Sequence, residues 1–167
     1  PVMAGTGSNS TEEAINLTRY AKKAGADSAL IVMPYYNKPT QGGMYAHFKA
    51  INDAVDLPLF IYNIPGRSVV DMTVETMVKL AKLENIIGVK DASNDSVRPT
   101  LLKNALEGQE FIQLSGEDPS QLPFMAAGGD GIISVTANVA PNLMAKFHKL
   151  WKDGEIVQAR VLQENMM

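Results

Sequence analysis

Six short apolar runs alternate with longer amphipathic stretches along this chain of 167 residues, and that alternation restricts the fold more than any other feature. The runs begin every ~20–30 residues, which is the spacing of one strand-and-helix unit. Continuous apolar runs of this length are typical of strands covered on both faces, as in parallel sheets. They occupy Val2–Ala4, Ser28–Met33, Leu57–Tyr62, Ile86–Lys90, Phe111–Ser115 and Gly131–Val135.

The stretches between the runs carry start and stop signals of helices. Ser10–Glu13 is a capping box, in which a hydroxyl and a carboxylate satisfy free backbone N–H groups, and Gly25 is a C-terminal stop. Thr73 predicts a cap for a helix over residues 74–81. Asp118–Gln121 places a cap residue before a proline, which predicts a helix that Asp118 caps. Pro141 predicts a further helix, which ends near residues 153–154.

We therefore expect a single α/β domain over residues 1–167. The pattern leaves two architectures open, a doubly wound sheet and a (β/α)₈ barrel. A barrel needs ~250 residues, so this chain would supply about strands 3 to 8. Pro1–Gly5 resembles the end of a strand and Glu155–Met167 a helix without a stop signal. We accordingly expect a fragment, truncated at both ends.

Composition and charge exclude several classes of function. Fifteen basic residues against eighteen acidic ones give a net charge of −3, which argues against a nucleic-acid or anionic-membrane surface. No Cys is present, and His47 and His148 are far apart in the sequence, so we expect no metal site. No apolar run approaches the ~20 residues of a membrane span, and no signal peptide is visible, so we expect a cytoplasmic protein.

Lys90 is the most informative candidate, because in both architectures the chemistry gathers at the carboxyl ends of the strands. Alternation along the run puts Ile86, Gly88 and Lys90 on one face, where the small glycine could leave room below the amine. A lysine held against apolar walls loses hydration, which lowers its pKa and frees the amine for a Schiff base. The alternative is a lysine just beyond the strand with its ammonium in water, and the pattern alone favours that alternative.

Two further loops carry candidate side chains. Tyr62 ends the preceding run and can relay protons to a reacting carbonyl, while Arg67 can hold a carboxylate through two hydrogen bonds. Tyr35 and Tyr36 follow another run. Adjacent residues of a strand face opposite ways, so one tyrosine could serve the site and the other a different surface, such as a subunit contact. The alternatives are core or loop packing for the tyrosines and a solvated Arg67.

Six motifs occur together in the order of one enzyme family, at matching spacing over essentially the whole chain. Each motif alone is short, but the set resembles the dihydrodipicolinate synthase (4-hydroxy-tetrahydrodipicolinate synthase) family. The motifs are Ala4–Asn9, Pro34–Asn37, Tyr62–Arg67, Ile87–Asp91, Leu114–Asp118 and Gly131–Asn138.

The resemblance implies a (β/α)₈ barrel that condenses pyruvate with aspartate semialdehyde in the diaminopimelate route to lysine. It implies no cofactor, because Lys90 would hold pyruvate as a covalent imine. Tyr62 would relay protons, and Tyr36 would complete the relay from a neighbouring subunit of a homo-oligomer, a dimer of dimers. Arg67 would hold the carboxylate of the semialdehyde.

The same resemblance implies further binding residues. Gly116 and Ile133 would line the pyruvate pocket, Ile133 through its backbone. Asn9, Glu13 and Tyr35 match part of the family's feedback site for lysine. The family's Gly-Thr-Thr-Gly-Glu motif, whose threonines bind the pyruvate carboxylate and join the relay, is absent from this sequence and would precede it.

Two other functions stay open. A pyruvate-dependent aldolase, such as a lyase of N-acetylneuraminate or of a 2-keto-3-deoxy sugar acid, would keep Lys90 and Tyr62 but normally lacks the arginine found at position 67. A catalytically silent α/β module would bind a ligand or partner without reacting, and the presence of lysine, two tyrosines and arginine in one pattern argues against it.

Overall fold

A curved parallel sheet of six strands is the framework of the structure, a computed structural model that describes residues 1–166. The strands pair in the order of the sequence, each parallel to the next. A doubly wound sheet would reverse its strand order at a switch point, so the sequential order confirms the predicted barrel architecture. The strands are β1 (Met3–Gly5), β2 (Ser28–Val32), β3 (Leu59–Asn63), β4 (Ile86–Asp91), β5 (Ile112–Ser115) and β6 (Gly131–Ile132).

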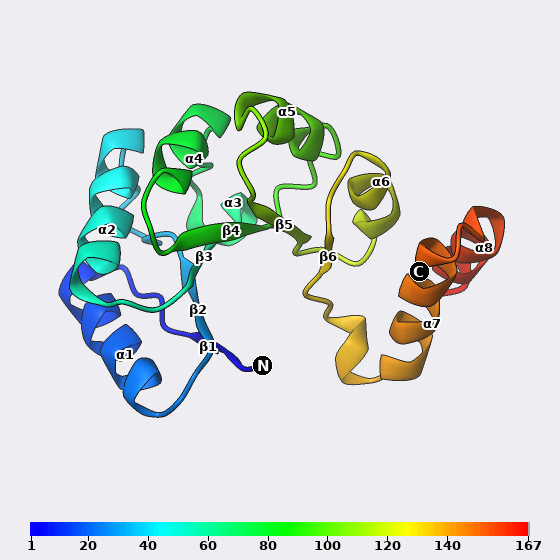
Figure 1. The fold of residues 1–167 in the computed structure, drawn as a ribbon, viewed down its shortest axis with the longest axis horizontal. Coiled ribbons are helices and arrows are strands. Elements are labelled where there is room, and N and C mark those ends of the chain that lie inside the picture. The colour runs from blue at the N-terminus through cyan, green and yellow to red at the C-terminus, as the bar shows by residue number, and fades with distance from the viewer. Residues whose placement is uncertain (167) are drawn as a thin grey trace.

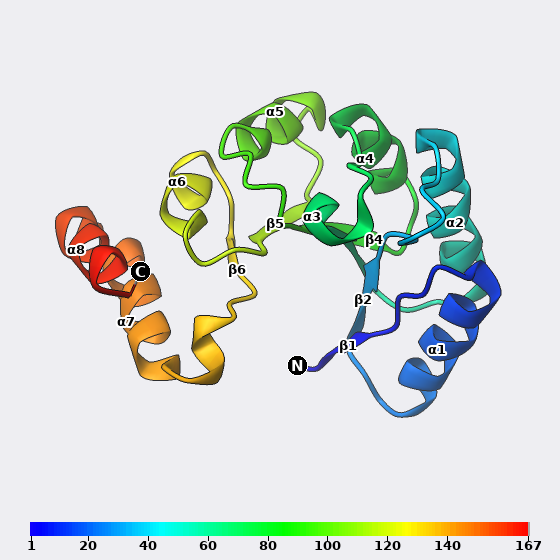
Figure 2. The same cartoon turned by 180° about the vertical axis from the view of Figure 1, so that it is seen from behind.

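The helices lie along the outer side of the arc of strands (Figure 1). The short helix α3 is the exception, since it lies over one end of the strands, the end nearer the viewer in Figure 2. The helices are α1 (Thr11–Lys23), α2 (Gln41–Ala54), α3 (Pro65–Ser68), α4 (Val74–Ala81), α5 (Arg98–Ala105), α6 (Gln121–Ala126), α7 (Pro141–Lys152) and α8 (Ile156–Met166), with a 3₁₀ turn, η1, over Thr136–Asn138.

The main core lies between the outer face of the sheet and the helices. Alternate residues of the strands point to this face, and they are fully or almost fully buried against α1, α2, α4 and α5. Each fully buried large apolar side chain contributes roughly 1.5–3 kcal/mol. The core includes Ala29, Ile31, Leu59, Ile61 and Val89 from the strands and Ala14, Phe48, Met77 and Leu102 from the helices.

The local helix signals are confirmed except at one position. Ser10 and Thr73 accept hydrogen bonds from the backbone of α1 and α4, and Gly25 follows α1 with a φ of 91°. The prediction that Asp118 caps a helix through Pro119 is wrong. Helix α6 begins at Gln121, and Ser120 occupies the N-cap position.

A register shift in β3 and β4 corrects the predicted faces of β4. Leu59 pairs with Ile86, but Phe60 pairs with Gly88 because an irregularity lies between Leu59 and Phe60. Ile86 therefore packs in the outer core and does not share a face with Lys90 as alternation predicted. A Cβ at Gly88 would lie 2.6 Å from Cε1 of Phe60, so this aromatic ring fills the space that the glycine leaves.

Candidate active site

Lys90 lies in β4 with its side chain enclosed by the neighbouring strands. Only 8% of the residue is exposed, and Nζ lies 4.1 Å from the centroid of the Tyr62 ring, which pairs with it from β3. Burial lowers the pKa of the Lys90 amine below its ordinary value, although the charges of Glu117 and Asp118 oppose that change. The solvated alternative is therefore wrong, because the Lys90 side chain is buried and its amine has lost hydration.

Gly116 makes room for the lysine side chain from the next strand. It follows β5, and its N–H donates to the Asp91 carbonyl at 2.7 Å. A Cβ at this position would lie 3.1 Å from Cε of Lys90 and 2.7 Å from Cβ of Ala92. The separation from Ala92 is too short for a side chain and the separation from Lys90 is tight, so a glycine at position 116 suits this placement of Lys90.

A pocket of about 430 Å³ opens beside Tyr62, and Arg67 and Tyr35 also line it. Gly7 and Val32 form part of its wall, at a point where a Cβ on the glycine would lie 2.5 Å from the Val32 nitrogen. Burial and the charge of Glu117 raise the pKa of the Tyr62 phenol, while Arg67 opposes them. The phenol therefore stays protonated at neutral pH, beside an exposed guanidinium.

The two adjacent tyrosines lie in different surroundings. Tyr35 lines the pocket of Tyr62, whereas Tyr36 is 88% exposed and has a φ of 72°. A left-handed backbone costs a residue with a side chain roughly 1–2 kcal/mol. The Tyr36 ring therefore lies exposed on the surface of this chain, outside the pocket that Tyr35 lines.

Asp118 joins the loop after β5 to the segment after β6, which carries Ile133. Its carboxylate accepts the N–H groups of Val135 and Thr136 at 3.0 Å each, and the hydroxyl of Ser134. Burial alone would raise the Asp118 pKa, but these hydrogen bonds outweigh it and lower the pKa. The N–H of Ile133 donates to the Ser115 carbonyl at 2.9 Å, so the backbone of Ile133 is fixed against β5.

The three residues that the family resemblance links to lysine lie near one another, Asn9 and Glu13 at the start of α1 and Tyr35 after β2. The Asn9 amide donates to the Tyr35 carbonyl at 3.2 Å. The hydroxyl of Ser8 donates to the Glu13 carboxylate. The cluster borders the pocket of Tyr62, since Tyr35 belongs to both.

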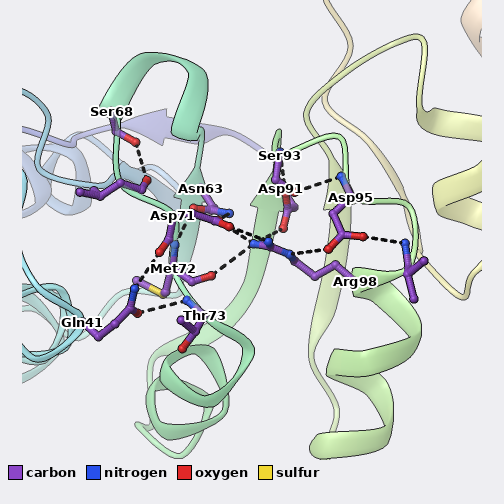
Figure 3. A network of polar contacts seen from close by, with 12 residues as sticks. Gln41, Asn63, Ser68, Asp71, Met72, Thr73, Asp91, Ser93, Asp95 and Arg98 are labelled. Atoms are coloured by element: carbon purple, nitrogen blue, oxygen red, sulfur yellow. Dashed lines mark hydrogen bonds and ion pairs between the residues drawn. The ribbon is translucent and has the colours of Figure 1, made fainter.

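A polar network lies on the outer face of the sheet at the ends of β3 and β4, and the sequence did not predict it. Arg98, Asp71, Asn63 and Asp91 form its centre (Figure 3). A signal was present, because Asn63 and Asp91 end β3 and β4 at positions that face the helices, where apolar residues are the rule.

Neither the acidic residues nor the histidines form a metal site in the described part of the chain. No group of three or more His, Asp or Glu within residues 1–166 could hold a metal ion. His47 is buried between α1 and α2, with Nδ1 2.9 Å from the Thr11 hydroxyl. Burial lowers the His47 pKa to about 4. No helix within residues 1–166 is long and apolar enough to cross a membrane.

Comparison with known proteins places this geometry in a family. Residues 1–167 match the model of the dihydrodipicolinate synthetase family. The 4-hydroxy-tetrahydrodipicolinate synthase of Rhodospirillum centenum is 62% identical over 168 residues, which are 100% of this chain and 57% of that relative. The enzyme of the same name from Bradyrhizobium diazoefficiens is 58% identical over 167 residues, covering 100% of this chain and 56% of that relative.

Solved structures agree. The chloride-inhibited dihydrodipicolinate synthase from Acinetobacter baumannii, complexed with pyruvate, superimposes with a TM-score of 0.92 at 50% identity, over 98% of this chain and 56% of that one. The dihydrodipicolinate synthase from Aquifex aeolicus gives 0.94 at 45% identity, over 99% and 56%. The chain thus spans about half the length of the relatives it matches. Its sequence and its fold both show that it belongs to the dihydrodipicolinate synthetase family.

Proposed function

We propose that the complete polypeptide containing this chain condenses pyruvate with aspartate semialdehyde, as a synthase of the diaminopimelate route to lysine. The observation that carries the proposal is the dehydrated Lys90 amine, at the carboxyl half of a barrel strand and 4.1 Å from the Tyr62 ring. The names of the relatives support it, because they are 4-hydroxy-tetrahydrodipicolinate synthases that are more than half identical to this chain.

The first chemical step is imine formation at Lys90. The free amine attacks the ketone carbon of pyruvate, and the resulting carbinolamine loses water to give the imine. Loss of a methyl proton then gives an enamine, whose carbon attacks the aldehyde carbon of the second substrate. Each stage moves a proton, and the protonated Tyr62 phenol beside the amine is the relay residue on this chain. No metal or organic cofactor takes part, because the covalent imine activates pyruvate.

Gly116 and Ile133 complete the pyruvate pocket in this proposal. Gly116 leaves the space next to the Lys90 side chain. Ile133 offers its backbone carbonyl, since its N–H is bonded to Ser115, on a segment that Asp118 holds beside β5. Asn9, Glu13 and Tyr35 are proposed to bind lysine as a feedback inhibitor. Their cluster shares Tyr35 with the pocket of Tyr62, so an inhibitor there would act on the neighbourhood of the relay.

Three substrates separate the proposed synthase from its alternatives. The complete polypeptide is incubated with pyruvate plus aspartate semialdehyde, with N-acetylneuraminate, and with 2-keto-3-deoxygluconate. Condensation with the semialdehyde supports the proposal, whereas turnover of a sugar acid alone would identify a lyase. Borohydride reduction with pyruvate covers the remaining case, because a catalytically silent module would trap no pyruvate.

Arg67→Ala is expected to weaken use of aspartate semialdehyde ten- to a hundredfold or more. The exposed guanidinium lines the Tyr62 pocket, and loss of a bidentate charged hydrogen bond costs ~1.5–3 kcal/mol. The rise should appear in KM for the semialdehyde, measured by steady-state kinetics. Imine formation with pyruvate should be spared. Arg67→Lys should recover part of the loss, because lysine keeps the charge but cannot donate two parallel hydrogen bonds to one carboxylate. Loss of both steps together would make Arg67 a structural residue.

Mixing Lys90→Ala protein with Tyr36→Phe protein is expected to restore activity that neither variant has alone. If Tyr36 serves the neighbouring subunit, a mixed dimer has one site with intact Lys90 and intact Tyr36. Random exchange should then give up to roughly a quarter of wild-type activity, since half of the dimers are mixed and one of their two sites is complete. Condensation is measured after the subunits have exchanged. An unrestored mixture of verified mixed dimers would place Tyr36 outside the partner's site.

A further inference from the structure

We propose that Arg98 is a positioning residue for the reaction, which fixes the ends of β3 and β4 so that Tyr62 and Lys90 face each other. The inference rests on the proposed imine chemistry at Lys90 and adds a residue that touches neither substrate. Its basis is the polar network of Figure 3, which joins both strand ends to the first residue of α5.

Arg98 makes contacts in three directions although only 11% of its side chain is exposed. Its two terminal nitrogens donate to the two carboxylate oxygens of Asp71 at 2.7 Å each. Nη1 lies 3.4 Å from Oδ2 of Asp91 and donates to the Met72 carbonyl at 3.2 Å, while Nε lies 3.7 Å from the Asp95 carboxylate. The hydrogen bonds to Asp71 raise the Arg98 pKa further. The guanidinium is therefore a fixed cation at the centre of the network.

Asp71 extends the network to β3. Its Oδ1 accepts the side-chain amide of Asn63 at 2.8 Å, and Oδ1 of Asn63 accepts the Met72 N–H at 3.1 Å. Asn63 is fully buried, so it has no freedom to turn toward water. Arg98 thus holds β4 directly through Asp91 and β3 indirectly through Asp71 and Asn63.

The strand register connects this network to the reactive pair. Tyr62 pairs with Lys90, and the next pair along the ladder is Asn63 with Asp91. Successive residues of a strand point to opposite faces. The network therefore holds Asn63 and Asp91 on the outer face of the sheet, while Tyr62 and Lys90 lie on the inner face. The Ala92 N–H also donates to the Asn63 carbonyl at 2.8 Å. A shift of Asp91 must therefore move Lys90 relative to Tyr62.

Loss of the Arg98 charge would disturb this end of β4. The Asp91 side chain is 3% exposed, and within residues 1–166 its Oδ2 accepts no hydrogen bond, so Arg98 is the cation that compensates it. A buried carboxylate without its cation is strongly unfavourable, and the strand end would move toward water.

The amine of Lys90 would then regain hydration, which raises its pKa. The charges of Glu117 and Asp118, which follow β5, favour the same direction, and the facing Tyr62 phenol is neutral; Asp91 lies on the opposite face of the strand. Because only the free amine forms the imine, the pH dependence of imine formation would move to higher pH.

The test compares Arg98→Ala, Arg98→Lys and Leu102→Ala in the complete polypeptide. Leu102 is buried in the same helix but packs in the apolar core, so its truncation is a control for destabilisation alone. Two measurements are made across pH, borohydride trapping with pyruvate and competitive acetylation of Lys90 by acetic anhydride, read by peptide mass spectrometry. The second reports the state of the amine without any substrate.

Arg98→Ala is expected to slow trapping at neutral pH at least about tenfold and to move both pH profiles upward by about one unit. Arg98→Lys should recover part of the loss, because lysine restores the charge but not the paired hydrogen bonds to Asp71. Leu102→Ala should lower Tm and leave both profiles in place. If Arg98→Ala does not fold, Asp71→Asn at nearly constant volume removes the charge that pairs with Arg98 and weakens its hold on β3 through Asn63, while the Arg98–Asp91 pair remains, so it should shift the profiles in the same direction by a smaller amount.

Two results would overturn the inference: unchanged profiles in the folded Arg98 or Asp71 variant, or an equal shift in Leu102→Ala. Failure of the proposed function looks different. In that case the wild-type protein traps no pyruvate, while an acetylation profile that still moves on Arg98→Ala would support the positioning of Lys90.

Discussion

Lys90→Ala is expected to abolish the trapping of pyruvate by borohydride in the complete polypeptide, and with it condensation. The variant lacks the amine that forms the imine, so the loss should be complete rather than graded. Burial keeps the Lys90 pKa below its ordinary value, so the free amine is more abundant at neutral pH than on a surface lysine. In the wild-type protein, trapping should rise with pH and level off below the pH at which an exposed lysine titrates. Reduction followed by peptide mass spectrometry measures the extent and the position of the adduct.

Two variants make the Lys90 experiment specific. Lys79→Ala removes an exposed lysine of α4 and should trap pyruvate as the wild type does. Lys90→Met keeps an unbranched side chain of similar length in the buried position, so a loss of trapping there cannot be assigned to a cavity. An adduct that persists on another lysine in Lys90→Ala would disprove the assignment of the nucleophile.

The architecture was predictable because its signals are local. Each apolar run lies within a few residues of an observed strand, and the caps at Ser10 and Thr73 depend on partners only three residues away. Only the family resemblance favours the (β/α)₈ barrel, since strand spacing alone fits a doubly wound sheet too. The sequential strand order is what separates the two.

The errors arise where a distant partner decides the local structure. Asp118 precedes a proline and has the pattern of a helix cap, but its hydrogen bonds come from residues 16 to 18 positions further on. Alternation along β4 predicts that Ile86 shares a face with Lys90. The register shift against Leu59 and Phe60 of the neighbouring strand turns Ile86 to the outer face. Arg98 and Asp71 are 27 residues apart, and no periodicity connects them.

The environment of Lys90 shows the same limit in the candidate site. The pattern alone favoured a solvated ammonium, since the residue ends an apolar run before a polar loop. Its burial comes from the Tyr62 ring on one neighbouring strand and from the missing side chain of Gly116 on the other. Only the resemblance carried that information, because a family motif includes the cross-strand partners that period-2 alternation omits.

Tyr62→Phe is expected to lower kcat for condensation by ~10²–10⁴-fold, the range for removal of a positioned proton-transfer group. The phenylalanine keeps the ring over the Lys90 amine, so the nucleophile should stay buried and reactive. Within residues 1–166 the Tyr62 hydroxyl makes no hydrogen bond, so its loss should leave Tm close to that of the wild type. Burial raises the Tyr62 pKa, so the phenol is a proton donor throughout the neutral range.

A matched control separates the relay from simple packing. Tyr45→Phe removes the same atom from a half-buried tyrosine of α2, which packs against the main core, and should leave kcat unchanged. Steady-state kinetics should show the loss in kcat, with little change in KM for pyruvate. The reason is that the hydroxyl transfers protons in the transition state and does not bind the ground-state substrate. If Tyr62→Phe retains a kcat near the wild-type value, Tyr62 only packs against the Lys90 side chain, and the proton must reach the substrate by another route.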